Sequence, residues 1–344
     1  MRGKIIKWIV ASLLISTLVG GITYYFIRPY LPNKINFESL GKPHQDENGT
    51  IPENPFQNWQ ERKRKRALAV IIDNADGAGA QSGLDKADVV VEVPVEGGLT
   101  RLLAIISADS IDLLGPIRSL RPTFVDLAKE YNAVLVHAGG SAEGLDTLGR
   151  ENQDHIDEIY GGSKAETAFW RVSDRPKPYN LYASSESLRK AAKELGYNLT
   201  TPPPERTYLK DDADVSGTDV SDLTILYPNR SNQIAYKYDK DTKVFQRYKN
   251  EKPHLTAKGE QLMAANVIVQ YVPSRVTDGD GRLQLILHGE GKTLILRQGK
   301  VIEGLWKKEP DGFTQFTDMK GRVIPLAEGT TWIEVVRNGT KVNY

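Results

Sequence analysis

Arginines and carboxylates gather in short segments of the first half of this 344-residue chain, next to glycine pairs and just before predicted helices. A guanidinium is a planar, forked donor that suits phosphate or carboxylate, and glycine lets the backbone approach a ligand closely. The pattern therefore predicts a cleft that binds an anion. Its candidate ligand-binding residues are Glu96, Arg101, Arg118, Arg121, Ser141, Arg171 and Asn180.

The same segments also allow a hydrolase or a transferase. Asp73 and Glu92 lie at or near predicted strand ends, and His137 is a titratable partner for them, so these three are the catalytic candidates. An extended strand would place Glu92 and Glu96 on one face, about 13 Å apart, which is wide for two carboxylates acting on one bond. Asp73 and His137 with a glutamate could hold a metal, but no motif such as H-E-x-x-H occurs. No metal site is predicted, and the cofactor is unknown.

Each candidate also has an ordinary structural role open to it. Ser141 stands where a helix cap is expected, and a histidine at a strand end is often only a hydrogen-bonded structural residue. The arginines could form internal ion pairs with Asp73, Asp88, Glu92 and Glu96. Aromatic residues near the last arginine segment could stack on sugar rings or simply cover the cleft; these are Phe169, Trp170, Tyr179 and Tyr182.

The strands and helices that must position these residues are predicted to form an α/β domain over residues 67–210. Short continuous apolar runs predict buried strands at residues 67–72, 88–95, 102–106 and 133–136. Pro122 opens one predicted helix, over residues 122–131, and Ser184 opens another, which ends before Gly196. Strands mixed with helices indicate an α/β domain.

A β-rich domain follows over residues 220–344, after a boundary at Pro202–Pro204 and an acidic stretch. Alternating apolar and polar residues predict strands at residues 234–238, 244–248, 267–272, 283–287, 293–296 and 331–336. Only residues 257–265 suggest a helix or a helical turn. This domain shows no acid–base constellation, so we expect any chemistry in the first domain and support or partner recognition in the second.

The N-terminus predicts where the protein works. Trp8–Ile27 contains no charged side chain, and twenty helical residues span roughly 30 Å, the thickness of a bilayer core. Basic residues precede the run, so the positive-inside rule predicts a cytoplasmic stub of residues 1–7, a transmembrane signal anchor, a linker over residues 28–66 and an extracytoplasmic body. The membrane is thus one expected partner.

Composition narrows the function classes. The chain has no cysteine, which excludes disulfides, thiolate metal ligands and thiol nucleophiles. Its net charge of +1 hides an uneven distribution, because residues 1–66 hold 11 basic and 5 acidic residues and the remainder holds 34 and 39. The body is therefore mildly acidic, no nucleic-acid partner is expected, and affinity for an anion must come from a local arginine cluster.

Ordered matches along residues 54–337 resemble the YerB-like lipoproteins, a bacterial envelope family of unknown function. They include Val70–Asn74, Gly115–Ser119, His137–Ser141 and Thr331–Glu334. The resemblance implies a fold and an envelope location but no reaction. Members of the family are typically lipidated on a cysteine, which this chain lacks, so the apolar N-terminal run must anchor it. The family also tends to carry His at the position of Tyr179.

Three classes of function stay open: a protein that binds an anionic envelope ligand (a glycan, a peptidoglycan fragment or a phosphate ester), an envelope hydrolase or transferase, and an assembly partner protein. Both site hypotheses make one spatial prediction, that the charged candidates line a single cleft. These charged candidates are Asp73, Glu92, Arg101, Arg118, Arg121, His137 and Arg171. If they scatter over the structure, both site hypotheses fail together.

Overall fold

The computed structural model of the chain describes residue 56 and residues 65–107, 110–204, 206–210, 216–228, 232–277 and 281–344. The predicted cytoplasmic stub, the transmembrane anchor and nearly all of the predicted linker lie outside these residues. Among the residues that are described, no helix is both long enough and apolar enough to cross a bilayer.

The N-terminal region is α/β, and its predicted buried strands form the core of a sheet. The predicted strands are β1 (Leu68–Asp73), β2 (Val89–Pro94), β3 (Thr100–Ile106) and β4 (Val134–His137), and an unpredicted fifth strand, β5 (His155–Asp157), lies at the end of the sheet. Strand β1 runs parallel to β4, β4 runs parallel to β5, and β3 lies antiparallel between β1 and β2. The carboxyl ends of β1, β4 and β5 therefore meet at one edge of the sheet.

Both predicted helices of this region, at residues 122–131 and 184–195, are present, together with two others. They are α2 (Pro122–Glu130), α3 (Ala142–Arg150), α4 (Gly162–Glu166) and α5 (Ser185–Glu194). Pro122 occupies the first turn of α2, and Ser184 caps α5 by accepting a hydrogen bond from the backbone N–H of Ser187. A small hairpin of β6 (Phe169–Arg171) and β7 (Leu181–Ala183) lies between α4 and α5 in the chain.

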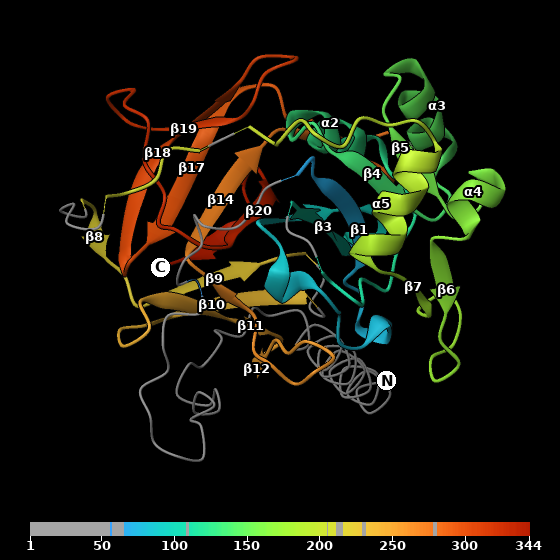
Figure 1. Cartoon of the computed structure of the whole chain (residues 1–344). Coiled ribbons are helices and arrows are strands. Elements are labelled where there is room, and N and C mark those ends of the chain that lie inside the picture. The colour runs from blue at the N-terminus through green and yellow to red at the C-terminus, as the bar shows by residue number, and fades with distance from the viewer. Residues whose placement is uncertain are drawn as a thin grey trace, which may run out of the picture. The chain divides into compact units, whose positions relative to one another are not determined.

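The C-terminal region is β-rich, and its strands extend the same sheet to eleven strands (Figure 1). The strands it adds are β8 (Thr218–Asp219), β14 (Asn266–Val272), β17 (Gly289–Arg297), β18 (Lys300–Lys308), β19 (Gln315–Asp318) and β20 (Thr331–Arg337). The two regions join where β2 pairs in parallel with β20, from Val89 opposite Thr331 to Glu92 opposite Glu334. The order of the main path is β19-β18-β17-β14-β20-β2-β3-β1-β4-β5.

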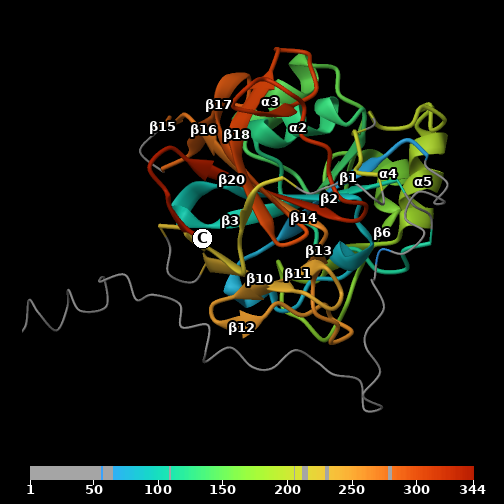
Figure 2. The same cartoon turned by 90° about the vertical axis from the view of Figure 1, so that its left-hand side faces the viewer.

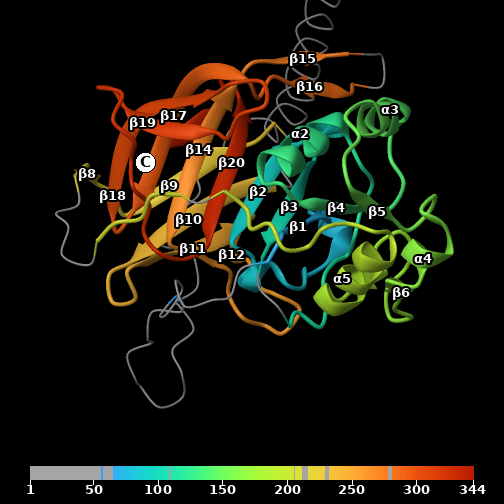
Figure 3. The ribbon, with the colours of Figure 1, turned by 45° about the horizontal axis from the view of Figure 1, so that its top comes forward.

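A second sheet of six strands covers one face of this large sheet (Figure 2). It contains β9 (Asp222–Leu226), β10 (Gln233–Asp239), β11 (Val244–Lys249), β12 (Lys252–Pro253), β13 (Met263–Ala264) and β21 (Lys341–Asn343). Helices α4 and α5 cover the same face beside it, whereas α2 and α3 cover the opposite face (Figure 3). The hairpin of β15 (Ser274–Val276) and β16 (Leu283–Leu285) also lies on the α2 side, where Leu285 joins the apolar core.

Alternate residues of the central strands feed the two apolar cores on the two faces. In β1, Val70 and Ile72 pack toward the six-stranded sheet and α5, whereas Ala69 and Ile71 pack toward α2. This period of two explains why the strands read as continuous apolar runs, since both faces are buried. It also sends neighbouring polar residues at a strand end to opposite faces.

The C-terminal region differs from the sequence prediction in one predicted helical segment and in several strands. Residues 257–265, predicted as a helix or a helical turn, form no helix: a turn that places Gly259 at φ 84° leads into β13, which pairs with β11. Several strands were missed, among them β9, β18, β19 and β21. In β18 the sequence interrupts the apolar pattern with Glu303 and Gly304.

A buried ion-pair network joins the two sheets. Arg247 of β11 pairs with Glu92 of β2, and its Nη1 lies 2.6 Å from Oε1 of Glu334 of β20. All three side chains are fully buried. Tyr236 donates a hydrogen bond to Glu334 at 2.6 Å, and the ring of Trp332 lies 4.1 Å from the guanidinium carbon. One guanidinium thus bridges both carboxylates across the interface between the sheets.

We predict that Arg247→Met destabilises the protein by about 3–5 kcal/mol, because it leaves two buried carboxylates without a counter-charge. Urea unfolding of the variant measures the loss. The matched control is Arg322→Met, since the Arg322 side chain is 74% exposed, and it should change the free energy of unfolding by less than about 0.5 kcal/mol. Equal stability of the two variants would contradict the role given to Arg247.

Candidate functional site

The candidate site lies where β1 and β4 separate at their carboxyl ends. The segment after the Gly115–Pro116 bond fills the gap, since the backbone N–H of Arg118 donates to the carbonyl of Ile71 at 2.9 Å. On its other side, the N–H of Ala138 donates to the carbonyl of Arg118 at 3.1 Å. Ligands of open α/β sheets bind outside the carboxyl ends of parallel strands, and this segment places Arg118 there.

Five charged residues form what we call the edge cluster: Asp73, Glu96, Arg101, Arg118 and Arg121. Asp73 and Arg101 are register partners in β1 and β3. Nε of Arg118 lies 2.7 Å from Oδ2 of Asp73, and Nε of Arg121 donates to Glu96 at 2.9 Å. Nη2 of Arg101 lies 3.7 Å from the same Glu96. The alternative of internal ion pairs is thus correct for Asp73 and Glu96.

The edge cluster holds three arginines but only two carboxylates, so one positive charge is in excess. Burial alone would raise the pKa of Glu96, but the hydrogen bond and charge of Arg121, together with the charge of Arg101, lower it to about 2. Burial lowers the pKa of Arg101 to about 10, and repulsion from Arg121 and Arg118 adds to this effect. Glu96 is therefore ionised at neutral pH. Its negative charge, together with that of Asp73, does not balance the three positive charges of the cluster's arginines.

Among the three arginines of the edge cluster, Arg118 is the one whose donors are least used. Its side chain is 23% exposed, and it uses Nε to reach Asp73. The ring centroid of Tyr179 lies 5.6 Å from its guanidinium carbon. Within the described part of the chain, the two terminal nitrogens of Arg118 make no hydrogen bond. These N–H groups can therefore bind an anion without breaking the contact with Asp73.

Buried side chains fix the backbone of Gly139 next to Arg118. Asp157 accepts hydrogen bonds from the N–H groups of Gly139 at 2.7 Å and Ile159 at 2.9 Å. Nδ1 of His137 lies 2.9 Å from the carbonyl of Gly139, which can only accept, so this nitrogen carries the proton. Nε2 of His137 then accepts from Nδ1 of His155, 3.2 Å away. His137 is fully buried, so it positions the loop and does not face a ligand.

Burial lowers the pKa of His137 to about 4, although the charge of Asp157 acts in the opposite direction. Burial also lowers the pKa of His155, which stacks on His137 with ring centroids 5.3 Å apart. Both imidazoles are therefore neutral at neutral pH, and a neutral His137 can accept the hydrogen bond from His155 at Nε2.

Three other predicted residues lie on neighbouring segments of the same edge. Ser141 is the N-cap of α3 and accepts a hydrogen bond from the N–H of Gly144 at 3.1 Å, which confirms its capping role. Arg171 donates to Glu158 at 2.8 Å and to Asn180 at 3.0 Å. The backbone N–H of Glu158 in turn donates to the carbonyl of His137, and this bond links the Arg171–Glu158 ion pair to the segment that carries His137.

Glu92 is the predicted residue that the structure places elsewhere. It points to the opposite face of the sheet, where it is fully buried against Arg247. The expectation that Glu92 and Glu96 share one face was wrong, because β2 ends at Pro94 and Glu96 begins a short turn. Asp88 accepts hydrogen bonds from the N–H and hydroxyl of Ser107 at 2.6 Å. The three catalytic candidates are therefore not gathered, although six of the seven charged candidates share one edge.

Sequence reasoning missed several polar residues. Arg247 and Glu334 complete the buried network, and Asp157 and Glu158 complete the edge. Glu334 carried a usable signal, because it is a charge inside the apolar run Thr331–Val336.

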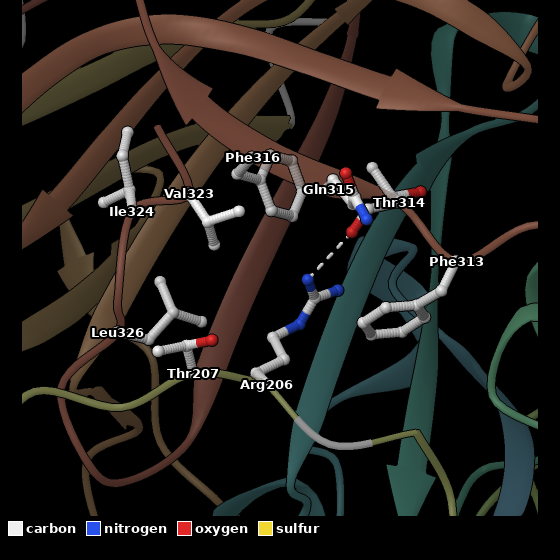
Figure 4. Close-up of a pocket in the computed structure, with 9 residues that line it drawn as sticks. All are labelled: Arg206, Thr207, Phe313, Thr314, Gln315, Phe316, Val323, Ile324 and Leu326. Carbon is white, nitrogen blue, oxygen red and sulfur yellow. Dashed lines mark hydrogen bonds between the residues drawn. The ribbon is translucent and has the colours of Figure 1, made fainter. Parts of the chain in front are cut away.

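A separate pocket of about 160 Å³ lies against the β-rich region (Figure 4). The guanidinium carbon of Arg206 lies 4.1 Å from the ring centroid of Phe313 and 5.1 Å from that of Phe316. Arg206 also donates to the carbonyl of Thr314 at 3.0 Å and to the hydroxyl of Tyr131 at 3.2 Å. These contacts hold in place the segment that connects the two regions. None of the predicted site residues lines this pocket.

The fold and the sequence correspond to a class of proteins of unknown function. Residues 56–198 match the family described as "Protein of unknown function (DUF3048) N-terminal domain", and residues 223–333 match the C-terminal domain of the same family. The chain belongs to this family.

A curated relative is "Putative lipoprotein YerB" of Bacillus subtilis (strain 168), which is 30% identical over 281 residues, covering 80% of this chain and 83% of the relative. The crystal structure of the YerB protein from Bacillus subtilis superposes with a TM-score of 0.74 at 27% identity, and the match covers 85% of this chain and all of that one. The resemblance to the YerB-like family is confirmed, as is the order of an α/β region followed by a β-rich region.

The low pKa of His137 predicts a pH dependence of stability. Between about pH 6.5 and pH 4 the unfolded chain binds a proton at this residue that the native protein excludes. The free energy of unfolding should therefore fall as the pH is lowered through this window, by up to about 3 kcal/mol from His137 alone.

Urea unfolding at a series of pH values measures this contribution as the difference between wild type and His137→Gln. The control is His288→Gln, because His288 is exposed and should keep the wild-type slope. If His137→Gln also keeps that slope, the neutral buried imidazole is not the cause.

Proposed function

We propose that this protein is anchored in the membrane, exposes its body outside the cytoplasm and binds an anionic envelope ligand at the edge cluster. The ligand would be a glycan, a peptidoglycan fragment or a phosphate ester. The observation that carries the proposal is Arg118, whose terminal nitrogens face no protein acceptor among the described residues and whose side chain reaches solvent. The excess of one arginine over the carboxylates of the cluster supports it.

The surroundings of Arg118 favour binding of a compact anionic group. Asp73 holds the guanidinium through Nε, so little side-chain entropy is lost when a ligand binds to its other nitrogens. The rest of the body is mildly acidic, with 34 basic and 39 acidic residues after residue 66. Such a charge balance gives no broad attraction for polyanions, so recognition depends on this local cluster.

The proposed anchor is Trp8–Ile27, with residues 1–7 in the cytoplasm and residues 28–66 as a tether. The curated relative from Bacillus subtilis carries the name of a lipoprotein, and a lipoprotein is held at a membrane by its lipid. This chain has no cysteine to carry such a lipid, and its uncharged N-terminal run would serve the same purpose.

The other functions have less support. A hydrolase that uses Asp73, Glu92 and His137 together would need groups that lie on different faces of the sheet or are fully buried. An assembly role would use the β-rich region and would not involve Arg118. Binding at the edge cluster is therefore the function that the geometry favours.

Arg118→Ala should weaken binding of the detergent-solubilised full chain to inorganic phosphate and to soluble peptidoglycan fragments by about ten- to a hundredfold, because a charge-assisted hydrogen bond contributes about 1.5–3 kcal/mol. Isothermal titration calorimetry measures the affinities. Arg275→Ala is the control, since Arg275 lies on the exposed β15 and should bind as wild type does. Equal affinity of Arg118→Ala and wild type, or no binding by wild type, would refute the proposal.

The anchor is tested separately by two charges placed in its apolar run. Leu14→Arg combined with Leu18→Arg should release the protein from membranes, because each arginine near the middle of a span costs about 2.5–3.5 kcal/mol. Carbonate extraction followed by centrifugation measures the membrane-bound fraction. Leu14→Val with Leu18→Val should stay bound. A charged variant that remains in the membrane fraction would contradict the anchor.

A further inference from the structure

We propose that Tyr179 is a positioning residue of the edge cluster. Its ring packs against the guanidinium of Arg118 and, together with Asp73, holds the terminal nitrogens of that arginine in the orientation that binds an anion. This inference rests on the proposed function and adds an uncharged residue to its site.

The β6–β7 hairpin brings Tyr179 to Arg118. The N–H of Ile117 donates to the carbonyl of Leu181 in β7 at 2.8 Å, and the two segments run antiparallel. In an antiparallel pair the chains run in opposite directions, so Arg118, which follows Ile117, comes beside the residues that precede Leu181. The guanidinium carbon of Arg118 lies 5.6 Å from the ring centroid of Tyr179, which is within the range of a cation–π contact.

The turn after β1 supports the hydroxyl end of this ring. A Cβ built on Gly77 would lie 3.0 Å from the hydroxyl oxygen of Tyr179 and 3.1 Å from its Cε2 and Cζ, so the ring packs on the backbone of this glycine. Arg175, from the loop of the same hairpin, donates to the carbonyls of Ala78 at 2.9 Å and Ala80 at 3.0 Å. These bonds hold the loop on the turn. The ring is therefore fixed to the turn while it contacts the guanidinium.

Arg118 gains orientation from this second contact. Its Nε lies 2.7 Å from Asp73, and its two terminal nitrogens have no protein acceptor within the described residues. A contact at Nε alone fixes one point of the guanidinium, and the contact with the ring of Tyr179 restricts its rotation about that point. An arginine that is already oriented loses less side-chain entropy when it binds an anion.

A ring that only filled space beside the cluster would not depend on the guanidinium, so the two roles differ in their coupling to Arg118. Arg118→Lys keeps the positive charge but replaces the planar group with an ammonium on a flexible stem, which a neighbouring ring orients less well. Positioning therefore predicts that a change of Tyr179 weakens binding in the wild-type background and has little effect in the Arg118→Lys background.

The test measures binding of inorganic phosphate to the detergent-solubilised full chain by isothermal titration calorimetry. Tyr179→Leu should weaken binding by about three- to tenfold, and Tyr179→Phe should bind as wild type does because it keeps the ring. In the Arg118→Lys background, Tyr179→Leu should change the affinity by less than about twofold. The matched control is Tyr160→Leu, since Tyr160 is 71% exposed and should leave the affinity unchanged.

Thermal unfolding of each variant checks that the fold is kept. If Tyr179→Leu unfolds at a lower temperature than wild type, Gly77→Val decides instead. Gly77 is exposed, and a side chain there would push the ring of Tyr179 aside without changing that residue. Gly77→Val should weaken phosphate binding by at least about twofold.

Weaker binding by Arg118→Ala with wild-type affinity in Tyr179→Leu would overturn this inference and leave the proposed function standing. An equal effect of Tyr179→Leu in the wild-type and Arg118→Lys backgrounds would also overturn it, because the ring would then act without the guanidinium. A loss in Tyr179→Phe as large as that in Tyr179→Leu would overturn it as well. If wild type binds no phosphate, the proposed function and this inference fail together.

Discussion

The ion pairs of Arg247 with Glu92 and Glu334 lie where the two sheets meet, and the geometry of the edge depends on them. Asn74 and Thr100 both belong to this buried network, because Thr100 donates to Glu92 at 2.7 Å and Asn74 donates to Glu92 at 3.0 Å. Their chain neighbours, Asp73 and Arg101, point to the opposite face and into the edge cluster. Successive residues of a strand face opposite sides, so fixing Asn74 and Thr100 in the buried network also fixes Asp73 and Arg101 on the other face. The buried network therefore sets the register that aims Asp73 and Arg101.

The buried network around Arg247 and the edge cluster differ in how completely their donors and acceptors are paired. In the buried network, burial and the charge of Glu92 raise the pKa of Glu334 to about 7, so that near neutrality one of the two carboxylates can keep a proton and one guanidinium suffices. Tyr227 donates to Oε2 of Glu334, and Tyr236 donates to Oε1, the oxygen that Arg247 also contacts. The edge cluster is partly open, has an arginine in excess and leaves the terminal nitrogens of Arg118 without a protein acceptor in the described chain. A closed network suits a structural joint, and an open cluster suits a binding site.

The sequence predicted the α/β region well, because its evidence is local. Continuous apolar runs marked β1 to β4, Pro122 and Ser184 marked helix starts, and most charged candidates fell at one edge since parallel strands end together. The failures involve contacts that are distant in sequence. Arg247 lies 155 residues from Glu92 and 87 residues from Glu334, so no pattern along the chain could pair them. Glu92 was misassigned for the same reason, as a strand-end carboxylate looks identical whether it faces solvent or a partner from another sheet.

The central claim is that Arg118 uses its terminal nitrogens to bind an anion at the edge of the sheet. Selenate resembles phosphate in shape and can be located by the anomalous scattering of selenium. A crystal structure of the full chain grown with selenate therefore tests the claim most directly. The account predicts an anomalous peak whose oxygens lie within hydrogen-bond distance of the terminal nitrogens of Arg118, with the contact to Asp73 retained. Anomalous peaks elsewhere with none at Arg118, or no peak at all, would contradict it.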